Sequence, residues 1–456
     1  MDQTLLRNTS IPKAYFSLAL PTVLSMVVTI VYNMADTFFI AQTQNADLVA
    51  GVSLCAPVFT LLMAFGNIFG QGGCSLISRL LGQKDEDGIR CVSAFCFYAA
   101  LLAGAASGLV MLLLRAPLLT LLGANAGSIS FASDYFVWLA IGAPFVVVSF
   151  IQSNLLCSVG RSTQSMIGSV SGSLVNIILD PILISVCGLG AAGAAIATVI
   201  GYIATDTFDL LCMVKKCPQF SLHPAHLAGA SAFAGQIFGV GIPAALVNLA
   251  QSFSMVLVNQ ALLAYGNNKI AAMGIALKVH SIAFLILVGF SFGGQPLIGY
   301  LYGAKDRVRL SELVSFCFRF ICGLAAALTL VLTAAAPLLM KLFLNDPVIV
   351  SDGTLMLRLQ AASMVFAAVV QIIMILFQAT GKTVPAFFLS VSRQGIVFVA
   401  VLAVAVRLAG CYGVIAAQAA ADLLTAAIAV GLYFTVLRRE LSGQVADTDK
   451  ANLVWR

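Results

Sequence analysis

The sequence predicts an all-α integral membrane protein with 12 transmembrane helices in two pseudo-symmetric six-helix bundles. Only 9% of its 456 residues are charged and 61% are hydrophobic, so solvated side chains cannot cover a globular surface of this size. Long apolar stretches recur between short polar breaks, and each is close to or longer than the roughly 20 residues that a helix needs to cross a bilayer. The first half of the chain also recurs in the second half, which predicts two similar bundles.

The apolar stretches are expected to form helices because a helix satisfies its own backbone hydrogen bonds in lipid. None has the alternating pattern of a strand in a membrane β-barrel. No small-residue cleavage site closes a short apolar run, so we expect the first helix to be retained and not removed as a signal peptide. The expected spans cover approximately residues 15–41, 48–78, 92–114, 131–157, 165–187, 190–213, 236–264, 270–301, 313–338, 355–379, 385–407 and 413–437.

The internal repeat has an offset of 220 to 222 residues. Leu20-Pro21 returns as Ile242-Pro243, and Gly160-Arg161-Ser162 returns as Gly381-Lys382-Thr383. Because each copy has an even number of spans, both copies enter the membrane in the same direction, and their symmetry axis runs along the membrane normal. We expect residues 1–226 to form an N-terminal six-helix lobe and residues 227–456 to form a C-terminal lobe. The main polar interruption, 210–235, is expected to be the linker between them.

The positions of Lys and Arg predict the orientation in the membrane. Alternate loops, counted from the N-terminus, carry most of these residues, and the loops of the other side carry about five. By the positive-inside rule both termini are cytoplasmic, which requires an even number of spans. The short loops favour a bacterial inner membrane, and the net charge of +6 is a topology signal and not a nucleic-acid patch. The residues on the other side are Arg115, Lys269, Lys341, Arg358 and Arg407.

The chain lacks the residue patterns of an enzyme. It contains no Gly-x-x-x-x-Gly-Lys-Ser/Thr phosphate loop, and its three histidines offer little for acid–base catalysis. The eleven cysteines lie mostly within apolar stretches, where a free cysteine behaves as a small packing residue. We therefore expect no catalytic site, no disulfide, no metal centre and no cofactor other than a coupling ion.

Acidic residues inside the predicted spans nominate the functional site, because a charge within the bilayer is costly. Asp36 lies in the first span with Tyr32 one turn earlier on the same face, and Asp180 follows Asn176 by four residues on one face of the fifth span. Pro181 removes a backbone hydrogen bond beside Asp180 and frees a carbonyl. Such aspartates can load a proton or bind Na⁺ from one side and release it on the other. The alternative is that each acid pairs with a neighbour to hold helices together.

Four motifs occur in order along the chain: Tyr32-Asn33-Met34-Ala35-Asp36-Thr37, Gly82-Gln83-Lys84-Asp85, Asn176-Ile177-Ile178-Leu179-Asp180-Pro181 and Gly294-Gln295-Pro296-Leu297-Ile298-Gly299-Tyr300. In this order and with this helix count, they resemble the multidrug and toxic compound extrusion (MATE) family over nearly the whole chain. The resemblance implies a V-shaped pair of lobes that works by alternating access. Such a transporter exports organic drugs and toxic compounds, often cationic or amphipathic, in exchange for H⁺ or Na⁺.

The resemblance also implies roles for individual residues. Tyr135 and Asn154 match polar residues of the fourth helix that join the coupling network, and we expect Tyr32 to support it. The seventh and tenth predicted spans lack the acids that one branch of the family carries there, so coupling is expected in the first lobe. The implied cation-coupling residues, which would hold H⁺ or Na⁺, are Asp36, Asn176, Asp180 and Thr198.

Other charged residues are weaker candidates. Lys278 either balances charge in the substrate cavity or extends its side chain to the membrane surface. Asp206 and Asp209 are expected to be solvated near the cytoplasmic end of the sixth span, within reach of lysines. Asp422 can pair with Arg393 across the second bundle.

Two other functions remain open at this point. One is a lipid-linked saccharide flippase of the same superfamily, although such proteins usually have more spans and a more cationic cavity. The other is a membrane protein without transport activity. We expect small-molecule substrates and a surrounding bilayer as partners, with no nucleic acid. We also expect a monomer, because one chain contains both bundles.

Overall fold

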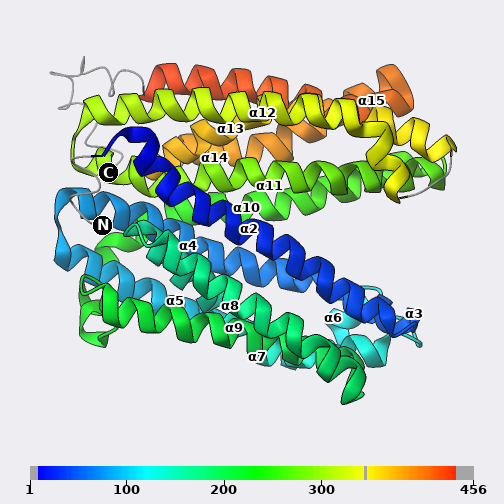
Figure 1. The fold of residues 1–456 in the computed structure, drawn as a ribbon, viewed down its shortest axis with the longest axis horizontal. Helices are drawn as coiled ribbons and strands as arrows, with labels where there is room; N and C mark the ends of the chain where they lie inside the picture. Colours follow the sequence, from blue (N-terminus) through cyan, green and yellow to red (C-terminus); the bar gives the residue numbers. More distant parts are fainter. Residues whose placement is uncertain (1–8, 344–346, 438–456) are drawn as a thin grey trace.

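The computed structural model describes residues 9–343 and 347–437, and in these ranges the chain is almost entirely helical. Figure 1 shows long helices lying roughly side by side in two groups. The helices are α2 (Ile11–Gln42), α3 (Ala46–Leu54), α4 (Ala56–Gln83), α5 (Glu86–Leu113), α6 (Arg115–Leu121), α7 (Ile129–Ser158), α8 (Ser162–Pro181), η1 (Ile182–Val186), α9 (Gly190–Lys216), η2 (Pro224–Gly229), α10 (Ser231–Leu263), α11 (Asn267–Gly303), α12 (Arg307–Phe343), α13 (Pro347–Thr380), α14 (Thr383–Val391), η3 (Ser392–Ile396), α15 (Val397–Leu432) and η4 (Tyr433–Leu437).

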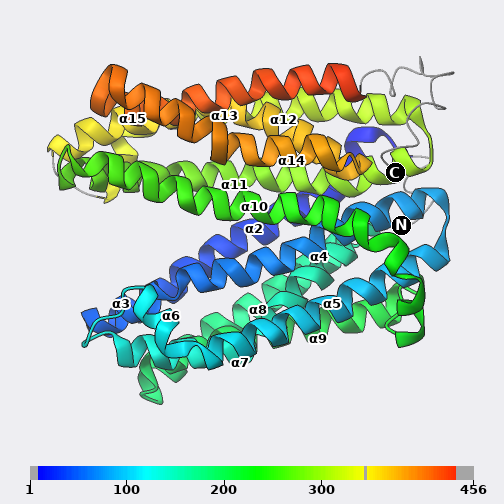
Figure 2. The same cartoon turned by 180° about the vertical axis from the view of Figure 1, so that it is seen from behind.

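Eleven helical segments in the described ranges are long and apolar enough to cross a membrane. The last of them, Thr383–Leu437, contains the final two predicted spans. Inside α15 the backbone of Gly410 is not helical (φ 55°, ψ −127°), and Gly413 packs against the carbonyl of Ala405. The chain therefore reverses at Gly410. Figure 2 shows α15 turning back on itself, and the fold agrees with the predicted twelve spans.

The internal repeat is visible in the backbone. At helix ends the chain turns through the left-handed region, where φ is positive, and it does so at equivalent places in both halves. This confirms that the two halves fold alike. The equivalent pairs, with their φ angles, are Gln44 and Gly266 (52° and 97°), Lys84 and Lys305 (61° and 58°), Gly160 and Gly381 (81° and 75°), and Gly190 and Gly410 (53° and 55°).

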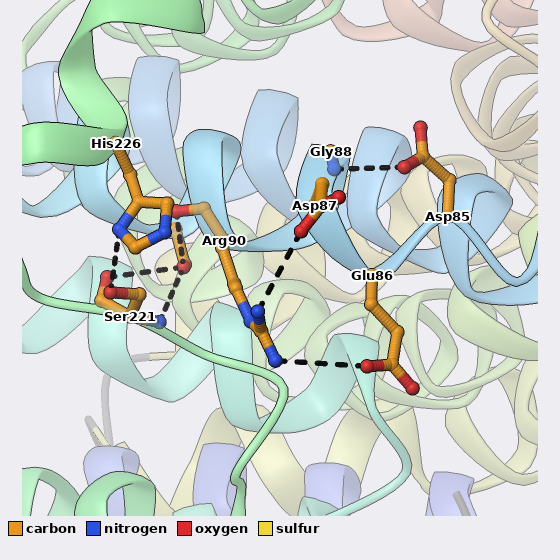
Figure 3. A network of polar contacts seen from close by, with 8 residues as sticks. Asp85, Glu86, Asp87, Gly88, Arg90, Ser221 and His226 are labelled. Carbon is orange, nitrogen blue, oxygen red and sulfur yellow. Dashed lines mark hydrogen bonds and ion pairs between the residues drawn. The ribbon is translucent and has the colours of Figure 1, made fainter.

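An aspartate caps the next helix after the turn at Lys84 and Lys305. Asp85 Oδ1 accepts a hydrogen bond from the backbone N–H of Gly88 at 2.9 Å, and Asp306 Oδ1 accepts one from Arg309 at 3.2 Å. Figure 3 shows the first of these caps. The repeated Gly-x-Lys-Asp motif thus ends one helix and starts the next in each half.

The segment between the halves is attached to α5. The hydroxyl of Ser93 accepts a hydrogen bond from the backbone N–H of Ser221 (3.1 Å), and that of Tyr98 donates one to the carbonyl of Leu222 (2.8 Å). Ser221 Oγ in turn contacts His226 Nδ1 at 3.0 Å, as Figure 3 shows. The predicted linker, residues 210–235, is longer than the segment that connects the two helices α9 and α10. Residues 210–216 and 231–235 continue the flanking helices, because their polar side chains lie on exposed helix faces.

The two groups of helices have separate hydrophobic cores, and each core receives a helix end from the other half of the sequence. The first turns of α2, including Tyr15 and Ala19, are buried in the core built mainly by α11–α15. Ile237 of α10 is buried in the core of α4–α9. In Figures 1 and 2 the two lobes lie together at the end that holds both described chain ends, and they diverge toward α3 and α6.

Glycines make the contact between the lobes close. Gly82 lies against the carbonyl of Tyr300, and Gly303 lies against the carbonyl of Arg79, so the contact is reciprocal across the pseudo-two-fold axis. A Cβ atom at either glycine would overlap the facing backbone. Nearby, the hydroxyl of Ser75 donates to the carbonyl of Gln378. The two lobes can therefore approach this closely only because residues 82 and 303 are glycines.

We expect Gly303→Val to open the lobes at this end. Overpacking a close contact costs about 1–3 kcal/mol, which shifts the equilibrium between lobe arrangements by roughly 5–150-fold. A cysteine placed at the buried Ser75 should then react faster with a thiol reagent, and labelling rates measure this. Gly323→Val is the matched control, because no atom lies within 4 Å of a Cβ built there. Equal labelling rates in the two variants would contradict the prediction.

Candidate functional site

Three of the four predicted coupling residues meet between α8 and α9. Asn176 and Asp180 lie one turn apart on the same face of α8, as their spacing predicts. Asn176 Nδ2 donates to Asp180 Oδ1 (3.4 Å) and to Thr198 Oγ1 of α9 (3.5 Å). All three side chains are at least 97% buried. The helices approach closely here because Gly201 packs against the Cβ of Asn176.

Asp36 joins this group from α2, which packs against α8. Its side chain is half-buried and lies near enough to Asp180 for their charges to interact. The structure therefore brings Asp36, Asn176, Asp180 and Thr198 together inside the first lobe. The sequence separates these four residues by more than 160 positions.

The site contains oxygen atoms that lack a hydrogen-bond donor. Asp36 Oδ1, Asn176 Oδ1 and Asp180 Oδ2 are buried without a partner. In the described part of the chain, no Lys or Arg forms an ion pair with either carboxylate. Buried acceptors and charges are costly without a partner. Carboxylate, amide and hydroxyl oxygens are ligands of the kind that hard cations prefer, so the residues present fit either H⁺ or Na⁺.

Tyrosines surround the acids. Tyr32 lies next to the hydroxyl of Thr198, and the buried Tyr135 lies close to both Asp36 and Asp180. Sequence reasoning missed Tyr202, which is near both of these tyrosines and contacts Phe59 with its ring tilted by 42° (ring centroids 6.1 Å apart). The sequence could have indicated Tyr202, because it follows Thr198 by one helical turn and therefore lies on the same face of α9.

Two supporting residues lie elsewhere. Asn154 lies beside Gly70 of α4, and its amide donates to the carbonyl of Phe150 one turn earlier on its own helix, α7 (2.7 Å). It lines a small cavity of about 40 Å³ between the lobes. Lys278 is exposed on α11, and none of its described interactions joins it to Asp36 or Asp180. The geometry does not bring Asn154 or Lys278 into contact with the paired acids.

The expectation for Asp206 and Asp209 is wrong. Both lie on α9 and are 92% and 100% buried, between α7 and α8, and not at a solvated surface. Lys215 is exposed and follows Asp206 by nine residues, which is two and a half helical turns, so it projects from the opposite side of α9. The prediction that Lys215 could reach Asp206 considered only their separation along the chain and not the sides of the helix on which they lie.

The family model described as MatE matches residues 21–182 and 243–405, which is most of the chain and covers both halves. The chain belongs to the MatE family. The two matched ranges correspond to the two copies of the repeat, and the resemblance seen in the motifs is confirmed.

Relatives of this MatE chain are similar over almost their whole length. It is 31% identical over 447 residues to multidrug export protein MepA of Staphylococcus haemolyticus, covering 98% of this chain and 97% of the relative. It is also 31% identical to MepA of Staphylococcus aureus strain NCTC 8325, covering 94% and 95%.

Solved structures show the same fold. One is a multidrug resistance MATE family transporter of the MOP superfamily in an outward-facing conformation, at a TM-score of 0.90 and 24% identity, covering 98% of this chain and 99% of that one. Another is a MOP superfamily transporter from Pyrococcus furiosus, at a TM-score of 0.89 and 24% identity, covering 97% and 98%.

The second lobe of this MatE chain holds a buried ion pair. Arg393 Nε lies 3.0 Å from Asp422 Oδ1, which also accepts a hydrogen bond from Gln418 (3.2 Å). This confirms the predicted partner of Asp422. The guanidinium lies 4.8 Å from the ring centre of Phe284, on which His280 stacks. In this lobe a built-in cation therefore neutralises the acid.

Proposed function

We propose that this chain is a secondary antiporter that exports organic, often cationic or amphipathic, compounds in exchange for H⁺ or Na⁺. Membership of the MatE family and relatives named multidrug export proteins support export. One observation carries the coupling: Asp36 Oδ1, Asn176 Oδ1 and Asp180 Oδ2 are buried without a hydrogen-bond donor, and within the described residues neither carboxylate has a basic ion-pair partner. A cation that neutralises them can be taken up and released, whereas a covalently attached Lys or Arg cannot.

The path of α2 supports a link between cation binding and lobe movement. Its first turns are buried in the core of the second lobe, near Tyr15, and Asp36 near its other end faces the coupling site of the first lobe. A change in charge at Asp36 therefore acts on a helix that contacts both lobes. Alternating access follows if the cation and the substrate favour opposite lobe arrangements, because only a difference in affinity can shift the equilibrium.

We further propose that the chain works as a monomer in a bacterial inner membrane, with residues 1–226 and 227–456 as its lobes. With both termini in the cytoplasm, the lobes touch at the cytoplasmic end and diverge outward, so this arrangement is outward-facing. The soft, apolar side chains of Met34 and Met255, both at least half exposed, suit adaptable binding of organic substrates.

The proposed antiport is tested by export of a fluorescent organic cation in inverted membrane vesicles, energised separately by a proton gradient and by a sodium gradient. Transport that depends on one gradient supports the proposal and identifies the ion. No dye movement under either gradient would overturn it. Scrambling of a labelled lipid-linked saccharide in the same vesicles would then identify the flippase alternative.

The orientation predicts the labelling of Cys187. This exposed cysteine follows η1, at the end of α8 that lies away from the contact between the lobes. A membrane-impermeant maleimide added to intact cells should therefore modify Cys187, and peptide mapping by mass spectrometry measures the site. Cys187→Ser should lose this label. Labelling that occurs only in inverted vesicles would place the termini outside.

A further inference from the structure

A second pair of buried acids lies in the first lobe, away from the coupling site. Asp206 and Asp209 are one turn apart on α9 and close enough for their charges to interact. The hydroxyl of Ser153 on α7 donates to Asp209 Oδ2 (3.1 Å), and Ser149 lies within reach of Asp206. The other titratable groups near the pair are Tyr202 and Cys157.

The two carboxyl groups lack enough partners to be buried as anions. Both oxygens of Asp206 and Oδ1 of Asp209 are buried without a hydrogen-bond partner. In the described ranges neither acid forms an ion pair. Two adjacent carboxylates without a cation repel each other and lose their hydration, so this arrangement requires a bound positive charge.

The packing around the pair favours a proton over a metal ion. Gly168 of α8 lies directly against Asp209 Oδ1, and Gly172 lies against the hydroxyl of Thr205. A sodium ion would need space and several further oxygen ligands between these helices, whereas a proton shared by carboxyl oxygens needs neither.

The pair is connected to the coupling site by one face of α9. Thr198, Tyr202, Thr205 and Asp209 follow each other at intervals of three or four residues, so they form a polar stripe between α7 and α8. At 1.5 Å per residue, the stripe extends about 16 Å from Thr198 to Asp209. Beyond Asp209 it reaches Cys157, which lines the small cavity between the lobes.

We propose that Asp206 and Asp209 form an inner proton-holding site on a path between the Asp36–Asp180 site and the end of the first lobe that touches the second lobe. This inference rests on the proposed antiport and adds a route for its proton. At each handover one O–H bond breaks and another forms between neighbouring carboxyl, hydroxyl or water oxygens. The number of protons is conserved, and each proton leaves into the aqueous phase at that end.

Infrared spectroscopy of the purified full-length protein in lipid vesicles tests the site without transport. A protonated buried carboxyl group has a carbonyl stretching band that a carboxylate lacks. We expect this band in the wild type, and its partial loss in Asp206→Asn and Asp209→Asn. Asp134→Asn, which removes an exposed acid of α7, is the matched control and should retain the band. If the Asn variants do not insert, Ser153→Ala should shift the band, because it removes the donor to Asp209.

Transport in vesicles provides the second readout. Proton-driven export should fall about tenfold or more in both Asn variants, because positioned carriers speed proton transfer, while binding of the fluorescent cation stays unchanged. The inference would be overturned if the carbonyl band of both Asn variants equalled that of the wild type. It would also be overturned if addition of Na⁺ removed the band from the wild type. If the band depends on the pair but no gradient drives export, the antiport proposal fails and the proton-holding site stands.

Discussion

Asp180→Asn is expected to reduce cation-coupled export strongly while the protein still inserts into the membrane. Asparagine keeps the shape of the side chain and the contact with Asn176, but it cannot be neutralised by a cation. The free energy that couples two ligands is typically about 1–3 kcal/mol, so coupled transport should fall roughly 5–150-fold. Uptake of a fluorescent cation into inverted vesicles under the effective ion gradient measures this loss.

Asp36→Asn should have a similar effect, and the double variant should be no worse than either single one. The two carboxyl groups belong to one site, and the effects of residues that act as a unit are not additive. Asp87→Asn is the control, because this acid is 91% exposed and forms only a surface pair with Arg90. Export at the wild-type rate in both Asp36→Asn and Asp180→Asn would contradict coupling at this site.

Much of the fold could be predicted because membrane helices leave strong local signals. Length and hydropathy located the spans, and the Gly-x-Lys-Asp repeat located equivalent turns, since Lys84 and Lys305 adopt the same left-handed backbone. Asp36 and Asp180 were singled out as coupling candidates because a charge within an apolar span is rare. The proximity of Asp36 to Asp180 came from a family resemblance, because spacing along the chain contains no information on which helices pack together.

The predictions failed where they depended on which side of a helix faces the neighbouring helices. Lys215 follows Asp206 by nine residues and lies on the opposite side of α9, whereas the acid is buried between α7 and α8. Asn154 was expected in the coupling network from the family resemblance, whereas its side chain faces α4. The side of a helix that faces a neighbour follows from packing of the whole lobe, which no short motif determines.

The repeat also shows how the two lobes differ at equivalent buried polar positions. At the offset of 220 residues, Thr198 corresponds to Gln418 and Tyr202 corresponds to Asp422. The second lobe therefore places its buried acid where the first lobe has the coupling network. There, however, Arg393 neutralises the acid permanently. At equivalent positions, the first lobe has buried acids without a basic partner among the described residues, and the second lobe has a buried ion pair.

Breaking that ion pair is expected to cause a large loss of stability. Asp422→Asn leaves the Arg393 guanidinium, whose side chain is 10% exposed, without its counterion. Removing one partner of a buried pair costs about 3–5 kcal/mol. Thermal unfolding of the protein purified in detergent should show a clear decrease in midpoint. Asp180→Asn should lower the midpoint much less, because no built-in cation loses its partner there.

The double variant Arg393→Met with Asp422→Leu separates the charge effect from the loss of contacts. Replacing both partners by apolar residues of similar size is often neutral or stabilising, because no charge is then left buried. We expect the double variant to unfold at a higher temperature than Asp422→Asn and to retain ion-coupled export, since its coupling site is unchanged. A double variant that is as unstable as the single one would show that packing around Phe284, and not the charge pair, stabilises this lobe.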